Sequence, residues 1–265
     1  MARTRRQVIG WPTILRELTV AAVTDVSSTT RRVTLVGEQL GAFEVAGGTA
    51  APFQSEGFDD QVKLLVPLAG AQRPPLPVQG PDRLEWGGAG GRPVAKDYTP
   101  RAFRPASDRS PAALDLDLVL HEGGFAAGWA RGVQPGELAW SVGPTRSLLI
   151  PTEIDHLIVS GDETALPAIA RLLEQWPTGV TGNVVIEVPG PSSKQELSSP
   201  IGVDVVWVHG AAAWIGEVEA LRPTAPTNFC WLAGEAGVVR RLRKFASTEW
   251  EIARDCLDAT GYWRV

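Results

Sequence analysis

The spacing of the apolar residues changes near the middle of the chain, and this change most limits the folds that are available. Up to about residue 150, short runs of β-branched or alternating apolar residues lie between segments rich in glycine and proline. From residue 151 onward, continuous apolar runs alternate with segments of helical periodicity. We therefore predict a β + α/β protein, with an antiparallel β-barrel over residues 1–150 and a parallel-sheet α/β nucleotide-binding domain over 151–265.

Five segments of the first part have the pattern of strands. Each is bounded by turn-forming residues, as several short strands of a barrel require. They cover residues 18–26, 32–40, 61–67, 114–121 and 137–142. Residues 68–95 are rich in glycine and proline and hold few apolar residues in phase, which predicts a long loop.

The second part is predicted to alternate strands and helices. The strands cover 156–161, 184–188, 203–208 and 228–232, and the helices cover 164–176, 211–221 and 236–257. The first strand is apolar throughout, which is typical of a parallel strand that is buried on both faces. The connection between the two parts is predicted at 144–155.

The composition excludes several classes of protein. Two Cys and three His among 265 residues, without ligand spacing, leave no iron–sulfur cluster, zinc site or disulfide scaffold. The net charge of −5 argues against binding nucleic acid through its phosphates. No phosphate-binding loop or G-x-S-x-G motif occurs. We expect no metal ligands and no side chain that acts as general acid or nucleophile, so an organic cofactor must carry any electrons.

Residues 96–101 (Lys-Asp-Tyr-Thr-Pro-Arg) combine an aromatic ring, a hydroxyl and a cation in an extended segment. Such a segment suits a flavin, since Tyr98 can pack on the ring, Thr99 can hydrogen-bond its edge and Arg101 can pair with the pyrophosphate. An ordinary strand with a surface arginine explains the same residues.

Residues 121–130 predict the end of a strand, a turn of small residues and a helix that begins near Ala126. The pair Gly123 and Gly124 would leave the backbone N–H groups of the first helical turn free to bind phosphate. A plain connection between a strand and a helix is the alternative.

Residues 161–167 follow the first buried strand of the second part and open its first helix. Asp162 is predicted to cap this helix, and Pro167 suits its first turn. Nucleotides bind at the carboxyl ends of the strands in such open sheets. A well-capped helix is the alternative reading of these residues.

Residues 231–236 again predict a strand, a turn of small residues and a helix, in which Arg240, Arg241, Arg243 and Lys244 follow. These cations can reach a phosphate or an anionic substrate, or they can form a solvated basic face. Near residue 265, Tyr262 and Trp263 can cover a flavin or dock the end of the chain.

In their order and spacing, these segments together resemble the siderophore-interacting protein family, which comprises flavin-dependent ferric-siderophore reductases of the ferredoxin–NADP reductase superfamily. The resemblance covers nearly the whole chain, from residues 32–37 through Gly143-Pro144 to residues 261–264. It implies that the barrel binds FAD and that the α/β domain binds NADPH or NADH. The cofactor-binding residues that it implies are Tyr98, Thr99, Pro100, Arg101, His121, Gly123, Gly124, Ala126, Ala127, Trp129, Asp162, Thr164, Ala165, Gly234, Glu235, Ala236 and Trp263.

Two departures from the family pattern concern the FAD segments. Lys96 stands where the family usually has arginine. Residues 121–126 read His-Glu-Gly-Gly-Phe-Ala where the family usually has H-G-x-G-P-A. Glu122 adds a negative charge beside the expected pyrophosphate, and Phe125 replaces a rigid proline. Both changes are expected to weaken FAD binding or to change its pose.

The implied activity is reduction of a ferric siderophore by NAD(P)H with release of ferrous iron. We expect this oxidoreductase to work as a monomer in the cytoplasm, without a nucleic-acid partner or a membrane span. A basic rim for the anionic siderophore is expected from Lys63, Arg131, Arg240, Arg243 and Lys244. The alternatives are a general NAD(P)H flavin reductase or diaphorase, and a non-enzymatic ferric-siderophore binding protein that has lost tight FAD binding.

Overall fold

The computed structural model describes residues 5–67, 71–80, 83–85, 93–198 and 200–265. Its contacts group the chain into two compact units. One unit is Val8–Leu148, and the other is Leu149–Val265 together with the described part of Met1–Gln7. The division falls within the predicted connection at 144–155. The first described residues join the second unit, where Arg5 pairs with Asp255 at 3.1 Å.

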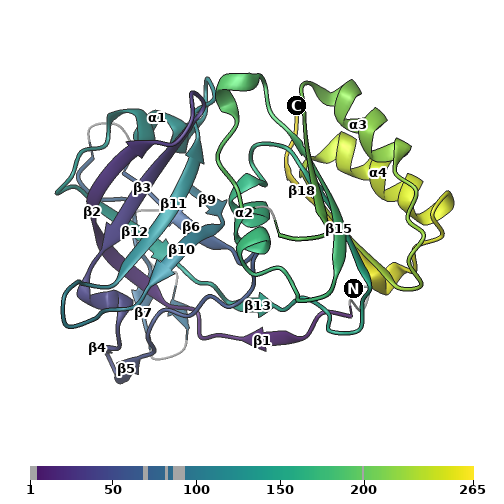
Figure 1. Ribbon diagram of the computed structural model, residues 1–265. Coiled ribbons are helices and arrows are strands. Elements are labelled where there is room, and N and C mark those ends of the chain that lie inside the picture. Colours follow the sequence, from purple (N-terminus) through teal and green to yellow (C-terminus); the bar gives the residue numbers. More distant parts are fainter. Residues whose placement is uncertain (1–4, 68–70, 81–82, 86–92, 199) are drawn as a thin grey trace. The chain divides into compact units, whose positions relative to one another are not determined.

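A curled, seven-stranded antiparallel sheet forms most of the unit Val8–Leu148 (Figure 1). Its strand order is β10-β11-β3-β2-β12-β6-β9. The strands are β2 (Leu15–Asp25), β3 (Thr30–Val36), β6 (Val62–Leu65), β9 (Ala95–Tyr98), β10 (Pro100–Arg104), β11 (Ala113–Val119) and β12 (Leu138–Val142). All five predicted strands of this part are present. The segment predicted at 32–40 ends earlier, at Val36, and Glu38–Leu40 forms the short 3-10 helix η1.

The inner face of this sheet carries the main apolar core. Alternate residues of β11, namely Leu114, Leu116 and Leu118, are fully buried in it. They pack there with residues of β2, β3, β6 and β12, as the period of two along a strand requires. The helix α1 (Phe125–Gly132) packs against the same core through Ala126 and Ala130.

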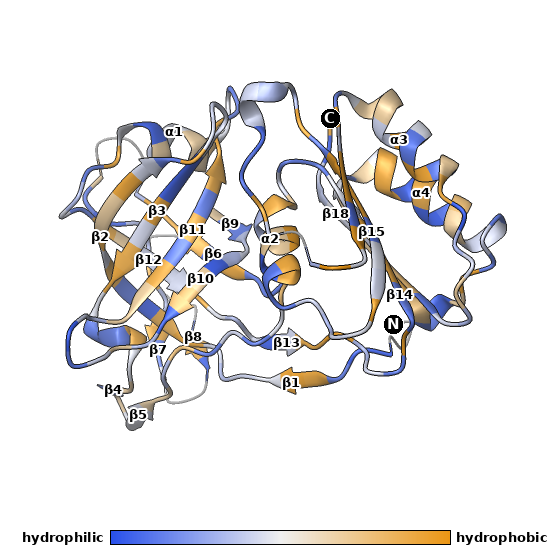
Figure 2. Cartoon of the chain, viewed as in Figure 1, coloured by the Kyte–Doolittle hydropathy of each residue, from blue (hydrophilic) through white to orange (hydrophobic). Residues whose placement is uncertain are grey.

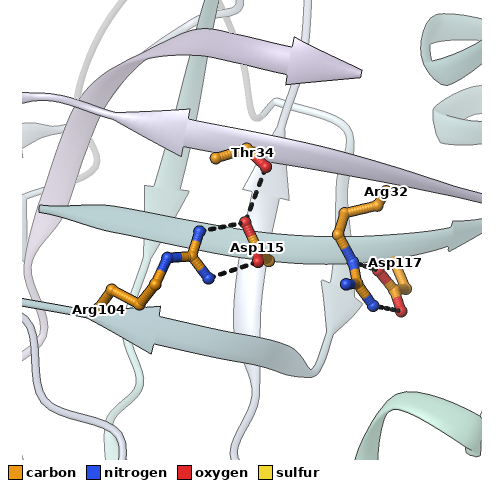
Figure 3. A network of polar contacts seen from close by, with 5 residues as sticks. All are labelled: Arg32, Thr34, Arg104, Asp115 and Asp117. Carbon is orange, nitrogen blue, oxygen red and sulfur yellow. Dashed lines mark hydrogen bonds and ion pairs between the residues drawn. The ribbon is translucent and has the colours of Figure 1, made fainter. Parts of the chain in front are cut away.

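The other face of β11 carries buried carboxylates that are paired with arginines of neighbouring strands (Figure 3). Asp115 accepts hydrogen bonds from Arg104 at 2.6 and 2.9 Å and from Thr34 at 2.8 Å. Asp117 accepts two from Arg32, at 2.7 and 2.9 Å. These cross-strand contacts fix the register of β10, β11 and β3, because a slip by one residue would turn every side chain to the opposite face.

Among the described residues of this unit, three short strand pairs lie outside the large sheet. They are β1 (Val8–Gly10) with β13 (Arg146–Leu148), β4 (Phe43–Val45) with β5 (Gly48–Ala50), and β7 (Val78–Gln79) with β8 (Leu84–Glu85). The last pair lies in the segment 68–95 that was predicted as a loop, and Leu76 and Leu84 of that segment pack on a second apolar cluster with Trp140. Residues 68–70, 81–82 and 86–92 of the predicted loop lie outside the described residues.

The second unit contains a five-stranded parallel sheet in the order β16-β15-β14-β17-β18 (Figure 1). The strands are β14 (His156–Gly161), β15 (Thr181–Glu187), β16 (Val203–Val208), β17 (Asn228–Glu235) and β18 (Leu257–Trp263). Helix α2 (Leu166–Glu174) covers one face, and α3 (Ala211–Ala220) and α4 (Ala236–Thr248) cover the other. This sheet and the curled antiparallel sheet confirm the predicted fold class.

The prediction of one helix over 236–257 is wrong in its second half. The helix α4 ends at Thr248, and residues 257–263 form the fifth parallel strand, β18. After the helix, Glu251 adopts a positive φ of 52°, and the N–H of Ile252 donates to the carbonyl of Ala246 at 3.1 Å. This tight reversal ends α4 and directs the chain back toward the sheet.

Helix α4 is amphipathic, as its mixed colours in Figure 2 show. Its buried face consists of Val239, Leu242 and Ala246, whereas the four cations from Arg240 to Lys244 are exposed. Among the described residues, no helix is long and apolar enough to cross a membrane, and no group of three or more His, Cys, Asp or Glu could hold a metal ion.

The buried ion pair between Asp115 and Arg104 generates a prediction about the stability of the fold. Burial alone would raise the pKa of Asp115, but the hydrogen bonds from Arg104 and Thr34 outweigh burial and hold the pKa below its ordinary value. The stabilisation is therefore present above about pH 4 and is lost as the pH falls through the lowered pKa. We expect Asp115→Asn to lower the free energy of unfolding at pH 7 by about 1.5–3 kcal/mol, measured by urea denaturation.

The matched control is Asp97→Asn, which removes the carboxylate from an exposed pair. Asp97 lies 2.7 Å from Lys63, and both side chains are about half exposed. Such pairs contribute at most about 1 kcal/mol. Equal losses in the two variants would contradict a structural role for the buried pair.

Candidate functional site

The parallel sheet reverses its strand order between β14 and β17, and this point lies beside several predicted site residues. From β14 the chain moves outward to β15 and β16, and it then returns to the other side of β14 as β17 and β18. The connections that follow the two central strands go to opposite faces of the sheet, and open α/β sheets bind nucleotides in the crevice between such connections. Gly161 pairs with Ala233 there, so Asp162 and Gly234 follow at the same edge.

Asp162 joins the ends of three strands through one buried carboxylate. Its Oδ2 accepts hydrogen bonds from the backbone N–H of Glu235 at 2.7 Å and from the indole Nε1 of Trp263 at 2.8 Å. Its Oδ1 accepts from the backbone N–H of Thr164 at 2.9 Å and from the Thr164 hydroxyl at 2.5 Å. The residue is only 3% exposed. The structure thus brings together Asp162, Thr164, Glu235 and Trp263.

The prediction that Asp162 caps the following helix is wrong. Ala165 occupies the N-cap of α2, without a side-chain hydrogen bond, and Pro167 lies in the first turn as predicted. Asp162 is one turn too early to cap this helix, because Glu163 and Thr164 lie in a turn that precedes it. Its carboxylate instead closes that turn and reaches across to β17 and β18.

Gly234 is required by the close approach of this carboxylate. A Cβ at residue 234 would lie 2.5 Å from Oδ2 of Asp162, and the φ of Gly234 is 140°. A larger residue would collide with Asp162 and would also be strained. The glycine that was predicted from the strand-turn-helix pattern is therefore explained by packing on Asp162.

Glu235 occupies the amino end of α4 with its own side chain. Its carboxylate accepts hydrogen bonds from the backbone N–H groups of Gly237 at 2.7 Å and Val238 at 2.9 Å. These bonds lower the pKa of Glu235 below its ordinary value. The first turn of α4, which begins at Ala236, already has a negatively charged acceptor, so a phosphate there would have to displace Glu235.

The cations of α4 lie at increasing distances from this edge. Because a helix rises about 1.5 Å per residue, Arg240 lies about 6 Å along the axis from Ala236, and Lys244 lies about 12 Å along it. Arg241 is paired with Glu219 at 2.9 Å. Arg240 is thus the nearest of these cations to the strand ends, while Arg243 and Lys244 are exposed farther along the helix.

One carboxylate at this edge was not anticipated from the sequence. Glu187 ends β15, and its Oε1 accepts a hydrogen bond from the backbone N–H of Gly210 at 3.1 Å. Burial raises the pKa of Glu187, and the nearby charge of Asp162 raises it further. The signal was available, since a carboxylate that ends a buried parallel strand points to the edge where ligands bind.

In the unit Val8–Leu148, the segment 96–101 forms the end of β9 and the start of β10. Tyr98 packs partly buried against the main core, and its burial raises its pKa to about 12. Thr99 is 6% exposed, and Pro100 is buried. The register of β10 against β11 shifts between Pro100 and Ala102, so Arg101 is the extra residue of a bulge. Bulges redirect side chains out of the normal alternation of a strand.

His121 and Gly124 form a close contact before α1. A Cβ at residue 124 would lie 2.3 Å from Cε1 of the His121 ring, so a larger residue would require the exposed imidazole to move from this position. Gly124 is the N-cap of α1 and provides no side-chain hydrogen bond, while Gly123 has a φ of 72°. The first backbone N–H groups of α1, at Phe125, Ala126 and Ala127, therefore lack a side-chain cap.

Phe125 and Trp129 face the main core, where both are partly buried. The aromatic ring of Phe125 thus packs the first turn of α1 against the core. The smaller side chain of a proline at this residue would make less apolar contact. Glu122 is exposed. The opposite end of α1 is stabilised by Arg31, which donates to the carbonyls of Ala130 at 3.1 Å and Arg131 at 3.0 Å.

Two cations expected at a substrate rim already have protein partners. Lys63 pairs across the strands β6 and β9 with Asp97 at 2.7 Å. The guanidinium of Arg131 donates to the carbonyl of Leu120 at 3.0 Å. Both side chains are exposed, so these contacts hold them at the surface without removing them from solvent.

The contacts of Asp162 generate the second prediction. Asp162→Asn retains one acceptor oxygen and turns an amide N–H₂ toward donors, which leaves buried groups unsatisfied. We expect the free energy of unfolding to fall by about 2–4 kcal/mol, measured by urea denaturation. We also expect Trp263 to lose its fixed position. Asp162→Asn should therefore change the tryptophan emission, and the same substitution should not change it in a protein that carries Trp263→Phe.

The control is Glu187→Gln, at the same edge of the sheet. It keeps the acceptor for Gly210 and removes a charge that burial disfavours, so the stability should stay within about 0.5 kcal/mol or rise. An Asp162→Asn protein as stable as the wild type would contradict the role of the carboxylate in joining the three strands.

Family models match both parts of the chain. The model described as siderophore-interacting FAD-binding domain matches residues 19–148, and the model described as siderophore-interacting protein matches residues 154–265. Among solved structures, a siderophore utilization protein from T. fusca is similar over 98% of this chain and 96% of its own, with 29% identity and a TM-score of 0.83. The siderophore-interacting protein SipS from Aeromonas hydrophila has 28% identity and a TM-score of 0.77, over 96% of this chain and 99% of its own.

Curated relatives are similar over nearly the full length. The NADPH-dependent ferric-chelate reductase of Escherichia coli is 30% identical over 94% of this chain and 93% of its own. The ferric vibriobactin reductase of Vibrio cholerae is 30% identical over 90% of this chain and 85% of its own. The chain belongs to the siderophore-interacting protein family.

Proposed function

We propose that this protein is an NAD(P)H-dependent ferric-siderophore reductase that uses FAD. The observation that carries the proposal is the uncapped amino end of α1, with His121 packed on Gly124, in the part that the FAD-binding family model matches. The full-length similarity to the E. coli and V. cholerae reductases supports the activity.

The residues of the unit Val8–Leu148 fit FAD. The first turn of α1 has backbone N–H groups without a side-chain cap, and anionic groups such as a pyrophosphate bind at such helix ends. The bulge at Arg101 takes this residue out of the strand alternation, and guanidinium groups pair with phosphates. Tyr98, Thr99 and Pro100 supply an aromatic, a hydroxyl and an apolar surface beside it. Gly123, Ala126, Ala127 and Trp129 complete the proposed set.

Bound FAD supplies transfer of a hydride from NAD(P)H and of single electrons to ferric iron. The protein contributes position and electrostatics. The uncapped N–H groups hold an anionic end, and the partly buried Tyr98 provides a ring against which a planar group can pack. Oxygen-rich chelators hold ferrous iron less tightly than ferric iron, so reduction favours release of the metal from its siderophore.

The carboxyl edge of the parallel sheet is the proposed nicotinamide nucleotide site. Asp162 acts there as a positioning residue, because its four hydrogen bonds hold Thr164, Glu235 and Trp263 in place. Ala165, Gly234 and Ala236 belong to the same proposed set, and Gly234 leaves the room that the Asp162 carboxylate occupies. Arg240, the cation nearest this edge, is suited to a phosphate.

The remaining proposed contacts concern the anionic substrate and the assembly. Lys63, Arg131, Arg240, Arg243 and Lys244 are exposed cations in an otherwise acidic chain, and anionic ferric siderophores are attracted to such groups. We assign FAD to residues 1–150 and the nicotinamide nucleotide to 151–265. We also take the protein to be a monomer in the cytoplasm, which light scattering and cell fractionation test.

The test of the proposed function is a spectroscopic titration followed by turnover. FAD added to the purified protein should give a bound flavin spectrum, NADPH or NADH should bleach it, and a ferric siderophore should restore it with release of ferrous iron. Faster turnover with free flavins than with ferric siderophores would favour a general flavin reductase. Binding of a ferric siderophore without FAD uptake would favour a binding protein.

Gly124 provides the sharpest test of the FAD site. Gly124→Ala introduces a Cβ within 2.3 Å of the His121 ring and displaces it. We expect the dissociation constant for FAD to rise by roughly ten- to a hundredfold, about 1.4–2.8 kcal/mol, in a fluorescence titration.

The matched control is Gly128→Ala in the same helix. A Cβ at residue 128 meets nothing within 4 Å, and alanine favours a helix over glycine. FAD affinity should therefore be unchanged and the stability equal or higher. Equal FAD affinity in Gly124→Ala and the wild type would remove α1 from the proposed site.

A further inference from the structure

A small cavity in the unit Val8–Leu148 has no role in the proposed reaction. Its volume is about 220 Å³, and it lies where the chain enters β2 and leaves β12. Trp11, Pro12, Ile14, Pro52 and Pro144 supply most of its apolar lining, and Arg16 is the single charged residue in that lining. None of these residues belongs to the proposed FAD, nucleotide or siderophore contacts.

Arg16 belongs to the cavity lining and carries a positive charge on a buried side chain. The residue is 3% exposed. Its guanidinium donates to the backbone carbonyls of Gln39 and Ala51, the latter at 2.7 Å. Its Cζ lies 5.8 Å from the ring centroids of Phe43 and Phe53. These partners are all neutral.

Among the described residues, no carboxylate pairs with Arg16, and its Nε has no hydrogen-bond partner. Burial lowers the pKa of Arg16 to about 10, so the group still carries its charge at neutral pH. A buried charge normally has a counter-ion, because removing it from water is costly. The wall of the cavity thus holds a cation that lacks an anionic partner.

The aromatic wall of the cavity is held in place independently of any ligand. The indole Nε1 of Trp11 donates to the hydroxyl of Ser147 at 2.8 Å, and this hydroxyl donates to Asp60 at 2.7 Å. The carbonyls of Gln39 and Ala51 likewise fix the guanidinium of Arg16. A ligand would therefore meet a preformed site, which lowers the entropic cost of binding.

The size and lining of the cavity define the class of ligand. A cavity of about 150 Å³ accepts benzene, so this one has room for one ring and a carboxylate. An apolar wall with a few placed polar groups is typical of sites for small molecules. We propose that the cavity binds a small organic monocarboxylate with an aromatic or compact apolar body, such as benzoate, with Arg16 as its counter-ion.

The experiment is calorimetric titration of the FAD-saturated full chain with benzoate, using benzamide as the neutral ligand of similar shape. Benzoate should bind, and benzamide should bind at least about tenfold more weakly. Arg16→Met should weaken the binding of benzoate by at least about tenfold, because it removes the charge and keeps an apolar side chain of similar length. Arg73→Met, at an exposed arginine of the same unit, should leave the affinity unchanged.

A second variant guards against a folding defect in Arg16→Met. Ala51→Leu fills the cavity while the backbone carbonyl that binds Arg16 stays in place, and it should also abolish benzoate binding. Thermal unfolding followed by circular dichroism identifies the folded variants. If Arg16→Met does not fold, the result with Ala51→Leu decides the test. No binding of benzoate at about 10 mM, equal binding of benzamide, or unchanged affinity in the folded variants would overturn the proposal.

Discussion

The arrangement of the carboxyl edge of the parallel sheet depends on the hydrogen bonds that the carboxylate of Asp162 accepts. One buried group accepts from Thr164, from the backbone of Glu235 and from the indole of Trp263. It therefore fixes the ends of β14, β17 and β18 relative to one another where the strand order reverses. The same approach requires glycine at residue 234. The hydrogen bonds offset the cost of burying the charge, and they use all of the carboxylate's capacity.

The two strand-turn-helix segments look alike in sequence, but their helix ends differ in the structure. At α1, the N-cap is Gly124 and no side chain caps the first turn. At α4, Glu235 reaches back and accepts from Gly237 and Val238. An anion thus finds free donors at α1 and a competing carboxylate at α4. This difference supports the proposed pyrophosphate position at α1, and it makes Arg240 the candidate cation of the proposed nucleotide site on the parallel sheet.

The sequence predicted the elements better than their ends or contacts. The strand 156–161 was placed correctly, because a continuous apolar run between polar residues has few alternatives. The strand β18 was missed, because residues 258–261 (Asp-Ala-Thr-Gly) contain no continuous apolar run, and because the helical pattern was extended to residue 257. The cap expected from Asp162 failed because Thr164 engages one carboxylate oxygen in a turn before α2, and donors on β17 and β18 engage the other oxygen. The donors on β17 and β18 lie far along the chain from Asp162. No local pattern contains that information.

Net charge says little about the field that an anionic ligand meets, and the placement of individual charges explains why. Asp115 and Asp117 are neutralised by arginines across neighbouring strands, and Glu235 is engaged with a helix end. Arg16, in contrast, is surrounded by neutral carbonyls and aromatic rings. A chain with a formal charge of −5 can therefore hold a positive charge without an anionic partner at one place, because carboxylates such as these three are engaged by nearby arginines or backbone N–H groups.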